Sequence, residues 1–423
     1  MTEVQPSPPP AVRWITRRLV EAGYDTWAVG GAVRDVLLGL PAGDWDLTTR
    51  ARPKEVRKLF PRTVPIGVEH GTVGILADDG TMFEITTFRR DVHTDGRRAV
   101  VAFADEIEED LGRRDFTINA IAWHPLRQEW LDPFGGRADL EARTLRAVGE
   151  PERRFAEDHL RVLRALRFAG RFGLSIERRT WRALREAVPH VSTLSAERVR
   201  EELVKVLDAD PTPSVALDLY ARSGALAVLY PEIASQATGD GDRWSRRLNA
   251  VDWLPRGRPF LRLASLLRPL DSRGAAQILL RLRLSNAQID ETARLASASR
   301  LPPARASAAE MRRWLSAVGA QRLSAVARLE LAEARGNGDP GAAESVAASW
   351  RAARRLLSEG PPLSVSDLAV DGGNLIRMGL KPGPTFGRLL ESLLSWVLED
   401  PSRNQVSLLE ERAKEILRQG GPS

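Results

Sequence analysis

Residues 28–49 read AVGGAVRDVLLGLPAGDWDLTT, and this stretch decides how the N-terminal part of the chain folds. A β-like run ends at Gly30 and Gly31, a helix is predicted over residues 32–38, and Gly39 ends that helix. A second strand is predicted directly afterwards. The order of strand, helix and strand therefore predicts a mixed α/β fold for this part of the chain.

Two acidic residues, Asp44 and Asp46, lie on that second predicted strand. Side chains alternate along a strand, so both carboxylates are expected on the same side. Parallel carboxylates repel each other, and a divalent cation relieves that repulsion. Hard oxygen ligands with few other protein groups suit Mg²⁺, which takes its remaining ligands from water and substrate phosphates. Two such ions would activate an attacking 3′ hydroxyl and stabilise a leaving pyrophosphate.

The glycine turn before the helix is suited to phosphates. Gly30 and Gly31 have no Cβ atoms where phosphates must approach, and the helix that follows offers unpaired N–H groups. Arg34, one turn into the helix, is expected to add positive charge against the phosphates. A Gly-Gly pair or an Asp-x-Asp alone is usually an ordinary turn, but the whole ordered set is much more specific.

A third carboxylate is expected on a neighbouring strand. Glu84, in the segment MFEITTFR (82–89), is an acidic residue within an otherwise apolar strand. The alternative is an exposed residue on an amphipathic strand. Asp91 and Asp95, in the segment that follows, are weaker candidates.

The chain divides into an α/β part and a helical part, so the predicted fold class is α+β with several domains. Residues 1–10, rich in proline, are expected to form a disordered tail. Short β-rich runs alternate with helices over residues 11–148; the predicted strands are 25–29, 45–48, 71–77, 82–88 and 130–132. From about Glu152 apolar residues recur every three or four positions, which predicts helices to the end. Clusters of Pro, Gly and Ser divide this part into the segments 149–208, 209–340 and 341–423.

Composition excludes several classes of protein. The chain has no cysteine, which rules out disulfides and cysteine-ligated zinc. No apolar run is long enough to span a bilayer and no signal peptide is evident, so a cytoplasmic location is expected. The net charge of +6 suits a polyanionic partner such as RNA, although a GC-rich genome would also produce many arginines. The oligomeric state is left open.

Five segments, in this order, resemble the motifs of class II CCA-adding enzymes, the bacterial and eukaryotic tRNA nucleotidyltransferases of the polymerase β superfamily. They are residues 30–48, RRDFTINA (113–120), DPFGGRADL (132–140), EDHLRVLRALRFA (157–169) and ERVREEL (197–203). The resemblance implies a catalytic nucleotidyltransferase head (11–148), a neck that recognises the base, and a body and tail that bind RNA. It implies addition of C, C and A to the 3′ end of tRNA from CTP and ATP, with Mg²⁺.

The fourth of these segments offers a way to choose the base. Asp158 and Arg161 lie three apart on a predicted helix and are expected to share a face. Asp only accepts hydrogen bonds and Arg only donates them. Cytosine and adenine each show an amino donor beside a ring-nitrogen acceptor, whereas guanine and uracil show the reverse. The alternative is an ordinary surface helix with an Asp158–Arg161 ion pair. Arg164 and Arg167 continue the row and are expected to help hold the nucleotide.

The resemblance suggests further nucleotide contacts. Arg114 is expected to contact the triphosphate, with Arg113 less certain, and Asn119 is expected to meet the ribose. Asp115 is expected to cap a helix. Residues 89–103 are charged and predict a mobile loop, which in the resembled family is associated with the switch from C to A addition.

Several basic residues are candidate RNA contacts, and two other functions compete with CCA addition. The basic residues proposed to grip RNA phosphates are Arg246, Arg247, Arg256, Arg258, Arg377 and Lys381. The closest alternative function is an A-adding tRNA nucleotidyltransferase or a poly(A) polymerase. A different class of protein, a non-catalytic RNA-binding protein on the same scaffold, is disfavoured because Asp44 and Asp46 are both intact.

Overall fold

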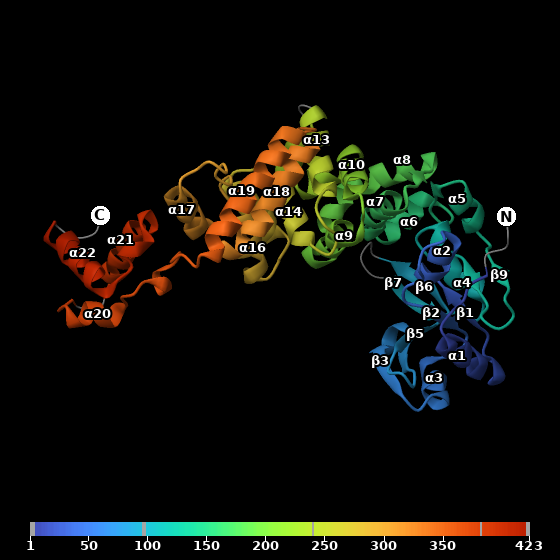
Figure 1. Cartoon of the computed structure of the whole chain (residues 1–423). Helices are drawn as coiled ribbons and strands as arrows, with labels where there is room; N and C mark the ends of the chain where they lie inside the picture. The colour runs from blue at the N-terminus through green and yellow to red at the C-terminus, as the bar shows by residue number, and fades with distance from the viewer. Residues whose placement is uncertain (1–4, 95–98, 239–240, 381–382, 420–423) are drawn as a thin grey trace. The chain divides into compact units, whose positions relative to one another are not determined.

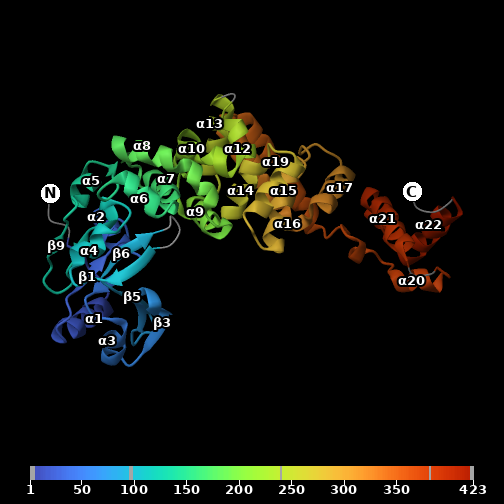
Figure 2. The ribbon, with the colours of Figure 1, turned by 180° about the vertical axis from the view of Figure 1, so that it is seen from behind.

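The structure, a computed structural model, describes residues 5–94, 99–238, 241–380 and 383–419. The chain forms two compact units, and each is described by itself (Figures 1 and 2). The first unit comprises the residues up to Val206 together with Asp210–Ala234. The second comprises Leu207–Ala209 and the residues from Ser235 onward.

Among the described residues, the first unit is built on a seven-stranded sheet. The strands, in spatial order, are β3 (Thr63–Gly67), β4 (Thr72–Leu76), β5 (Met82–Thr87), β2 (Asp46–Thr49), β1 (Thr26–Val29), β8 (Ala122–Trp123) and β9 (Trp130–Leu131). Strands β2 and β5 are parallel, and the other neighbours are antiparallel. All five predicted strands are present. Two further strands were not predicted: β3, which contains Pro65, and β8, which has only two residues.

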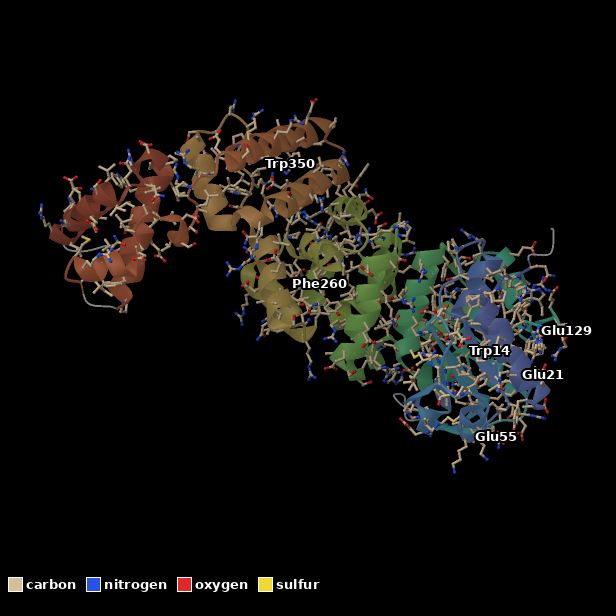
Figure 3. The ribbon with its side chains drawn as sticks, turned by 60° about the horizontal axis from the view of Figure 1, so that its bottom comes forward. Trp14, Glu21, Glu55, Glu129, Phe260 and Trp350 are labelled. Carbon is tan, nitrogen blue, oxygen red and sulfur yellow. The ribbon has the colours of Figure 1, made fainter. Side chains whose placement is uncertain are left out.

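Short helices surround this sheet: α1 (Pro10–Glu21), α2 (Gly31–Leu37), α3 (Pro53–Leu59), α4 (Ile107–Gly112) and α5 (Gly136–Glu141). Helix α1 buries Ile15 and Leu19 completely, while Trp14 packs edge-on against Phe60 with ring centroids 5.4 Å apart (Figure 3). The N-terminal segment differs from the predicted disordered tail in its described part. Pro6 and Pro8 are buried, and α1 begins at Pro10, where the fixed φ of proline suits a first helical turn.

The predicted mobile loop at residues 89–103 contains regular structure. Strands β6 (Arg89–Thr94) and β7 (Ala99–Phe103) pair antiparallel as a separate two-stranded ribbon. The predicted loop is therefore a hairpin over its described residues, because its charged sequence is interrupted by the β-prone run AVVAF. Asp95, a weaker candidate, lies outside the described residues, and for Asp91 only the backbone is described.

Helices α6 (Pro151–Glu157), α7 (Leu160–Phe172), α8 (Arg178–Ala187) and α9 (Ala196–Ala209) follow the sheet. Figures 1 and 2 show α6, α7 and α8 gathered on the side of the sheet away from α3. Helix α10 (Pro213–Ser223) crosses α7 so closely that a Cβ on Gly170 would lie 2.5 Å from the Cβ of Ala216. This packing explains why residues 210–234 belong to the first unit, whereas the sequence predicted a new domain from residue 209.

The described part of the second unit is helical, as predicted. Its helices are α13 (Gly241–Asp252), α14 (Pro259–Leu267), α15 (Ser272–Arg281), α16 (Asn286–Ser297), α17 (Ala308–Val318), α18 (Leu323–Gly336), α19 (Pro340–Ser358), α20 (Gly372–Arg377), α21 (Pro384–Glu399) and α22 (Val406–Arg418). Leu389, Leu393 and Leu409 form a fully buried core among the last three helices. Within the described residues, no helix combines the length and apolar character needed to cross a bilayer.

Candidate active site

The predicted metal ligands Asp44 and Asp46 lie at the start of β2. Asp46 is the first residue of the strand. Asp44 lies just before the strand, whereas the sequence had predicted both residues on it. Trp45 between them is buried, while both acidic residues are exposed. The alternation of side-chain direction therefore holds across the strand boundary, and both carboxylates remain open to solvent on one side.

Glu84 lies on the neighbouring strand β5, beside Asp46. The parallel pairing of β2 with β5 sets Leu47 opposite Ile85, so the residues before them, Asp46 and Glu84, are also neighbours. The pKa of Asp46 is raised to about 6, chiefly by desolvation of its carboxylate; Arg114 opposes this rise, and Glu84 and Asp44 add to it. Both of the other carboxylates therefore lie close enough to Asp46 to repel its charge.

The donor chemistry of this site fits Mg²⁺. Within the described residues, no three or more carboxylates or imidazoles are already gathered closely enough to hold an ion. Mg²⁺ does not need such a cage, since it is commonly bound by one or two carboxylates and takes water and phosphate oxygens for the rest. A cation would relieve the repulsion that Glu84 and Asp44 exert on Asp46.

Gly30 forms the turn beside these carboxylates. Its φ of 75° and ψ of −133° lie in a region that side chains with a Cβ rarely adopt. A Cβ at this position would lie 3.3 Å from Nη1 of Arg114 and 3.5 Å from Oδ2 of Asp46. Glycine thus allows the backbone to approach both the acidic group and the guanidinium.

Asp110 on α4 is a buried acidic residue that holds Arg114 in place. It was not predicted from the sequence. Asp110 is 1% exposed and accepts hydrogen bonds from Nη2 of Arg114 at 3.3 Å and Nε of Arg113 at 3.1 Å. Burial would raise the pKa of Asp110, but Arg114 and Arg113 outweigh it and hold the pKa below its usual value. The sequence pattern that could have predicted this contact is an acidic residue one helical turn before a pair of arginines. Nε of Arg114 is buried without a partner in the described part of the chain, so the guanidinium keeps an unused donor.

Arg34 is turned inward and does not face the expected phosphate position. Its guanidinium is 6% exposed, pairs with Asp35 at 2.7 Å and donates to Oδ1 of Asn119 at 2.6 Å. It also lies over the ring of Phe172, 4.4 Å from the centroid. The expected contact with phosphates is therefore replaced by a buried link from α2 to the 3₁₀ turn η2 (Thr117–Asn119).

Asp115 continues this link to α7. It accepts hydrogen bonds from Nδ2 of Asn119 at 2.9 Å and from Nε of Arg164 at 2.7 Å. Burial would raise the pKa of Asp115, but Arg164 and Asn119 outweigh it and lower the pKa to about 2. The expected helix cap is thus a buried ion pair. Asn119 and Arg164, expected to touch the nucleotide, connect the sheet to α7.

Asp158 and Arg161 do not lie on one continuous helix. Asp158 has extended backbone angles (φ −152°, ψ 106°) and separates α6 from α7. Its Oδ2 accepts a hydrogen bond from Nη2 of Arg198 at 2.8 Å, while Arg161 donates to Oε2 of Glu157 at 2.8 Å and to the carbonyl of Arg113 at 2.9 Å. The alternative of a simple Asp158–Arg161 ion pair is therefore not found. Each side chain is held by a different partner.

Arg167, the last residue of the predicted row, points into the protein. Its Nε donates to Oε2 of Glu202 at 2.6 Å, and the two side chains are 7% and 2% exposed. The pair joins α7 to α9. This placement does not favour the expected contact with a nucleotide.

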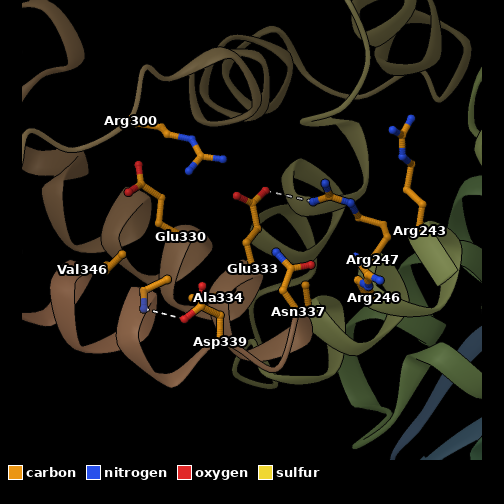
Figure 4. Close-up of a pocket in the computed structure, with 12 residues that line it drawn as sticks. Arg243, Arg246, Arg247, Arg300, Glu330, Glu333, Ala334, Asn337, Asp339 and Val346 are labelled. Atoms are coloured by element: carbon orange, nitrogen blue, oxygen red, sulfur yellow. Dashed lines mark hydrogen bonds and ion pairs between the residues drawn. The ribbon is translucent and has the colours of Figure 1, made fainter.

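The second unit contains a pocket of about 420 Å³ between α13 and α18 (Figure 4). Arg243, Arg246 and Arg300 line it and are exposed. Arg247, a predicted RNA contact, instead pairs with Glu333 at 3.0 Å and is only 18% exposed. The other predicted contacts Arg256, Arg258 and Arg377 are exposed, and Lys381 lies outside the described residues.

Family models match two parts of the chain. The Poly A polymerase head domain matches residues 26–146, which contain the sheet and the acidic residues. The model described as the probable RNA and SrmB- binding site of polymerase A matches residues 173–236, from the end of α7 to α12 (Pro231–Ala237).

Relatives match the chain over nearly its whole length. The CCA-adding enzyme of Geobacillus kaustophilus is 36% identical over 395 residues, covering 92% of this chain and 93% of that protein. The CCA-adding enzyme of Limosilactobacillus fermentum is 33% identical and covers 96% of each. The crystal structure of the CCA-adding enzyme of Bacillus stearothermophilus in complex with CTP has a TM-score of 0.79 at 32% identity, covering 97% of this chain and 100% of that one. The predicted fold class and resemblance are confirmed, and the chain belongs to the class II CCA-adding enzymes, which carry a head of the poly(A) polymerase type.

Proposed function

We propose that this chain adds C, C and A to the 3′ end of tRNA, with CTP and ATP as substrates and pyrophosphate as the leaving group. The observation that carries the proposal is the placement of Asp46 beside Asp44, Glu84 and Arg114, next to the turn at Gly30. Relatives that match the chain over nearly their whole length bear the name of this reaction.

Nucleotidyltransferases of this family typically depend on metal ions. The residues that would hold two Mg²⁺ ions are Asp44 and Asp46, with Glu84 beside them. When bound, the ions supply positive charge at the triphosphate and at the attacking 3′ hydroxyl. Arg114, aimed by Asp110, would set its guanidinium against the triphosphate beside Gly30, where no side chain takes up space.

Base choice is assigned to Asp158 and Arg161. Asp158 would accept from the exocyclic amino group of cytosine or adenine, and Arg161 would donate to the adjacent ring nitrogen. Guanine and uracil would set acceptor against acceptor and donor against donor. A site that hydrogen-bonds its substrate in this way rejects the wrong partner by about 10⁴-fold. Asp158 is 27% exposed, whereas Arg161 is 12% exposed and would exchange its bond to Glu157 for the base.

A nucleotide-addition assay tests the reaction. Purified protein is incubated with tRNA lacking its last three nucleotides and with CTP alone, ATP alone or both. The expected products are two added residues with CTP alone and three with both nucleotides. A long ladder of A residues with ATP alone would instead identify a poly(A) polymerase, and addition of A only to tRNA that already ends in CC would identify an A-adding enzyme.

Two substitutions separate chemistry from choice. Asp44→Ala is expected to abolish transfer and leave tRNA binding, measured by filter retention, largely intact. Asp158→Ala is expected to retain transfer and to admit UTP and GTP. Full activity in Asp44→Ala would revive the non-catalytic class of function, and full selectivity in Asp158→Ala would remove the base-reading role.

The RNA grip is assigned to the helical body and tail, with the exposed arginines around the pocket of Figure 4 as the main candidates. One enzyme must serve many tRNAs, so contacts to phosphates suit it better than contacts to bases. A cytoplasmic location stays a prediction.

A further inference from the structure

The seven-stranded sheet carries an exposed apolar surface made by Ile66 and Met82. Ile66, on β3, is 41% exposed, and Met82, on β5, is 47% exposed. Both side chains lie over Gly74, on the strand β4 between them. A Cβ on this glycine would lie 2.7 Å from Cδ1 of Ile66 and 3.1 Å from Sδ of Met82. The two side chains therefore lie side by side, and we call them the apolar platform.

The apolar platform lies on the same face of the sheet as Glu84. Gly74 is the cross-strand partner of Glu84, and directly opposed residues of an antiparallel pair point to one face. Met82 lies two residues before Glu84, about 7 Å along the same face, at the strand end where Asp44 precedes β2. The pairing of β5 with β2 sets Asp46 next to Glu84. The apolar platform is thus continuous with the acidic site.

The order of the strands separates two sides of Asp46. Gly30 and Arg114, where the triphosphate is proposed to bind, lie on the side of β1. Strands β5, β4 and β3 follow on the other side. In phosphoryl transfer the attacking and leaving oxygens lie roughly in line, on opposite sides of the phosphorus. The attacking 3′ hydroxyl therefore has to approach from the side of Glu84, where the apolar platform is next to it.

We propose that Ile66 and Met82 bind the base of the RNA's 3′-terminal nucleotide and so place its 3′ hydroxyl beside Glu84 and Asp46. Every base has an apolar face, so a contact to that face tolerates any sequence. Such a contact suits an RNA end that changes with each addition. The inference rests on the proposed function, because it takes the carboxylates as the site of transfer.

An RNA without its terminal base tests the contact in the full-length protein. Addition of C from CTP is measured on tRNA that ends in the first added C, and on the same RNA with an abasic 3′-terminal residue. For the wild-type protein, kcat/KM for the RNA is expected to fall about tenfold on the abasic RNA, as for the loss of about 60 Å² of buried apolar surface.

The double variant Ile66→Thr, Met82→Thr removes the apolar platform, and threonine suits a strand. It should lose about tenfold on the ordinary RNA and at most twofold more on the abasic one, because the same contact cannot be lost twice. KM for CTP at saturating RNA should stay within twofold of wild type, since the triphosphate binds on the other side of Asp46. Thermal unfolding checks the fold; if the double variant does not fold, Met82→Thr carries the test with an effect of about threefold.

The matched control is the double variant Leu280→Thr, Val406→Thr. Leu280 and Val406 are 64% and 45% exposed on helices of the second unit, and this variant should keep the full tenfold loss on the abasic RNA. An equal loss on the abasic RNA in wild type and in the platform variant would overturn the inference and leave the proposed function standing. The same loss together with a changed sedimentation coefficient would assign the apolar platform to a contact between copies of the chain. If the wild-type protein adds no C to either RNA, the proposed function itself fails.

Discussion

At the scale of single residues, Gly30 is the position where space is most limited. An alanine there would have to adopt a backbone conformation that costs about 1–3 kcal/mol. Its Cβ would also lie 3.3 Å from the guanidinium of Arg114. We expect Gly30→Ala to displace Arg114 or the turn itself. Because small misplacements in an active site lower rates by up to about 10²-fold, kcat/KM for CTP should fall by one to two orders of magnitude.

Gly39 supplies the matched control for this substitution. It also has a positive φ, 69°, but an added Cβ would meet nothing within 4 Å. Gly39→Ala should therefore cost stability and little activity. An equal loss of activity in both variants would show that backbone strain near α2, and not crowding of Arg114, is responsible.

The buried pair of Asp115 and Arg164 makes stability depend on pH. The pKa of Asp115 is about 2 in the folded protein, below the ordinary 3.8, so its ionised form favours the fold above pH 4 and this contribution disappears as pH falls toward 2. The shift corresponds to about 2 kcal/mol. Urea unfolding should therefore find Asp115→Asn less stable by about that amount at pH 7, with the difference shrinking below pH 4. A difference that does not change with pH would contradict the ionic role of the pair.

At the scale of elements, helix α4 connects the hairpin to Arg114, the arginine proposed to contact the triphosphate. Asp110 on α4 accepts from the N–H of Arg89, the first residue of β6, at 3.3 Å as well as from Arg113 and Arg114. Asp110→Asn keeps the shape and removes the charge that aims both arginines. We expect KM for CTP and ATP to rise together, and stability to fall by about 3 kcal/mol, as when one partner of a buried ion pair is lost.

Asp105→Asn is the control for this element. Asp105 lies close to α4 and pairs with Arg52 at 3.0 Å, but its side chain is 75% exposed. Exposed pairs contribute about 0–1 kcal/mol, so this variant should resemble wild type in steady-state kinetics and in unfolding. If Asp110→Asn changed KM for only one of the two nucleotides, its role would lie in base choice and not in holding Arg114.

The elements also show what local sequence can and cannot predict. Strands β1, β2 and β5 follow from alternation and β-branched residues, and Glu84 was correctly expected beside the acidic pair. The break at Asp158 was not expected, because the apolar period runs through it; in the structure Asp158 accepts a local hydrogen bond from the N–H of Leu160 and a distant one from Arg198. The inward direction of Arg34 was equally hidden, since its partners Asn119 and Phe172 come from distant parts of the chain.

At the scale of the whole molecule, the sequence predicted the helices better than it predicted which helices pack into one compact unit. Helices α10 and α11 (Ala225–Leu229) look like the start of a new domain after the prolines near residue 211, yet they belong to the first unit. The cause is the close approach of Gly170 to Ala216, a contact between small residues that leaves no hydrophobic pattern of its own. The division into head, neck, body and tail stays a prediction.

The role in RNA binding that we propose for the second unit can be tested on binding of the whole tRNA. Arg243 and Arg300 are exposed at the pocket between α13 and α18, whereas Arg294, on α16, is 56% exposed and pairs with Asp290. We expect the double variant Arg243→Ala, Arg300→Ala to weaken tRNA binding about tenfold at 150 mM salt, the Debye length there being about 8 Å. The slope of log Kd against log salt should fall by about one to two, because each lost phosphate contact removes about 0.7–0.9.

Measuring KM for CTP distinguishes a loss of tRNA binding from a loss of nucleotide binding or catalysis. KM for CTP should remain within twofold at saturating tRNA, because the acidic residues and base readers lie in the first unit. Arg294→Ala, measured over the same salt series, is expected to keep the wild-type slope. An equal change in the control would mean that the overall positive charge, and not this pocket, attracts the RNA; an unchanged slope in the double variant would place the phosphate contacts elsewhere on the body or tail.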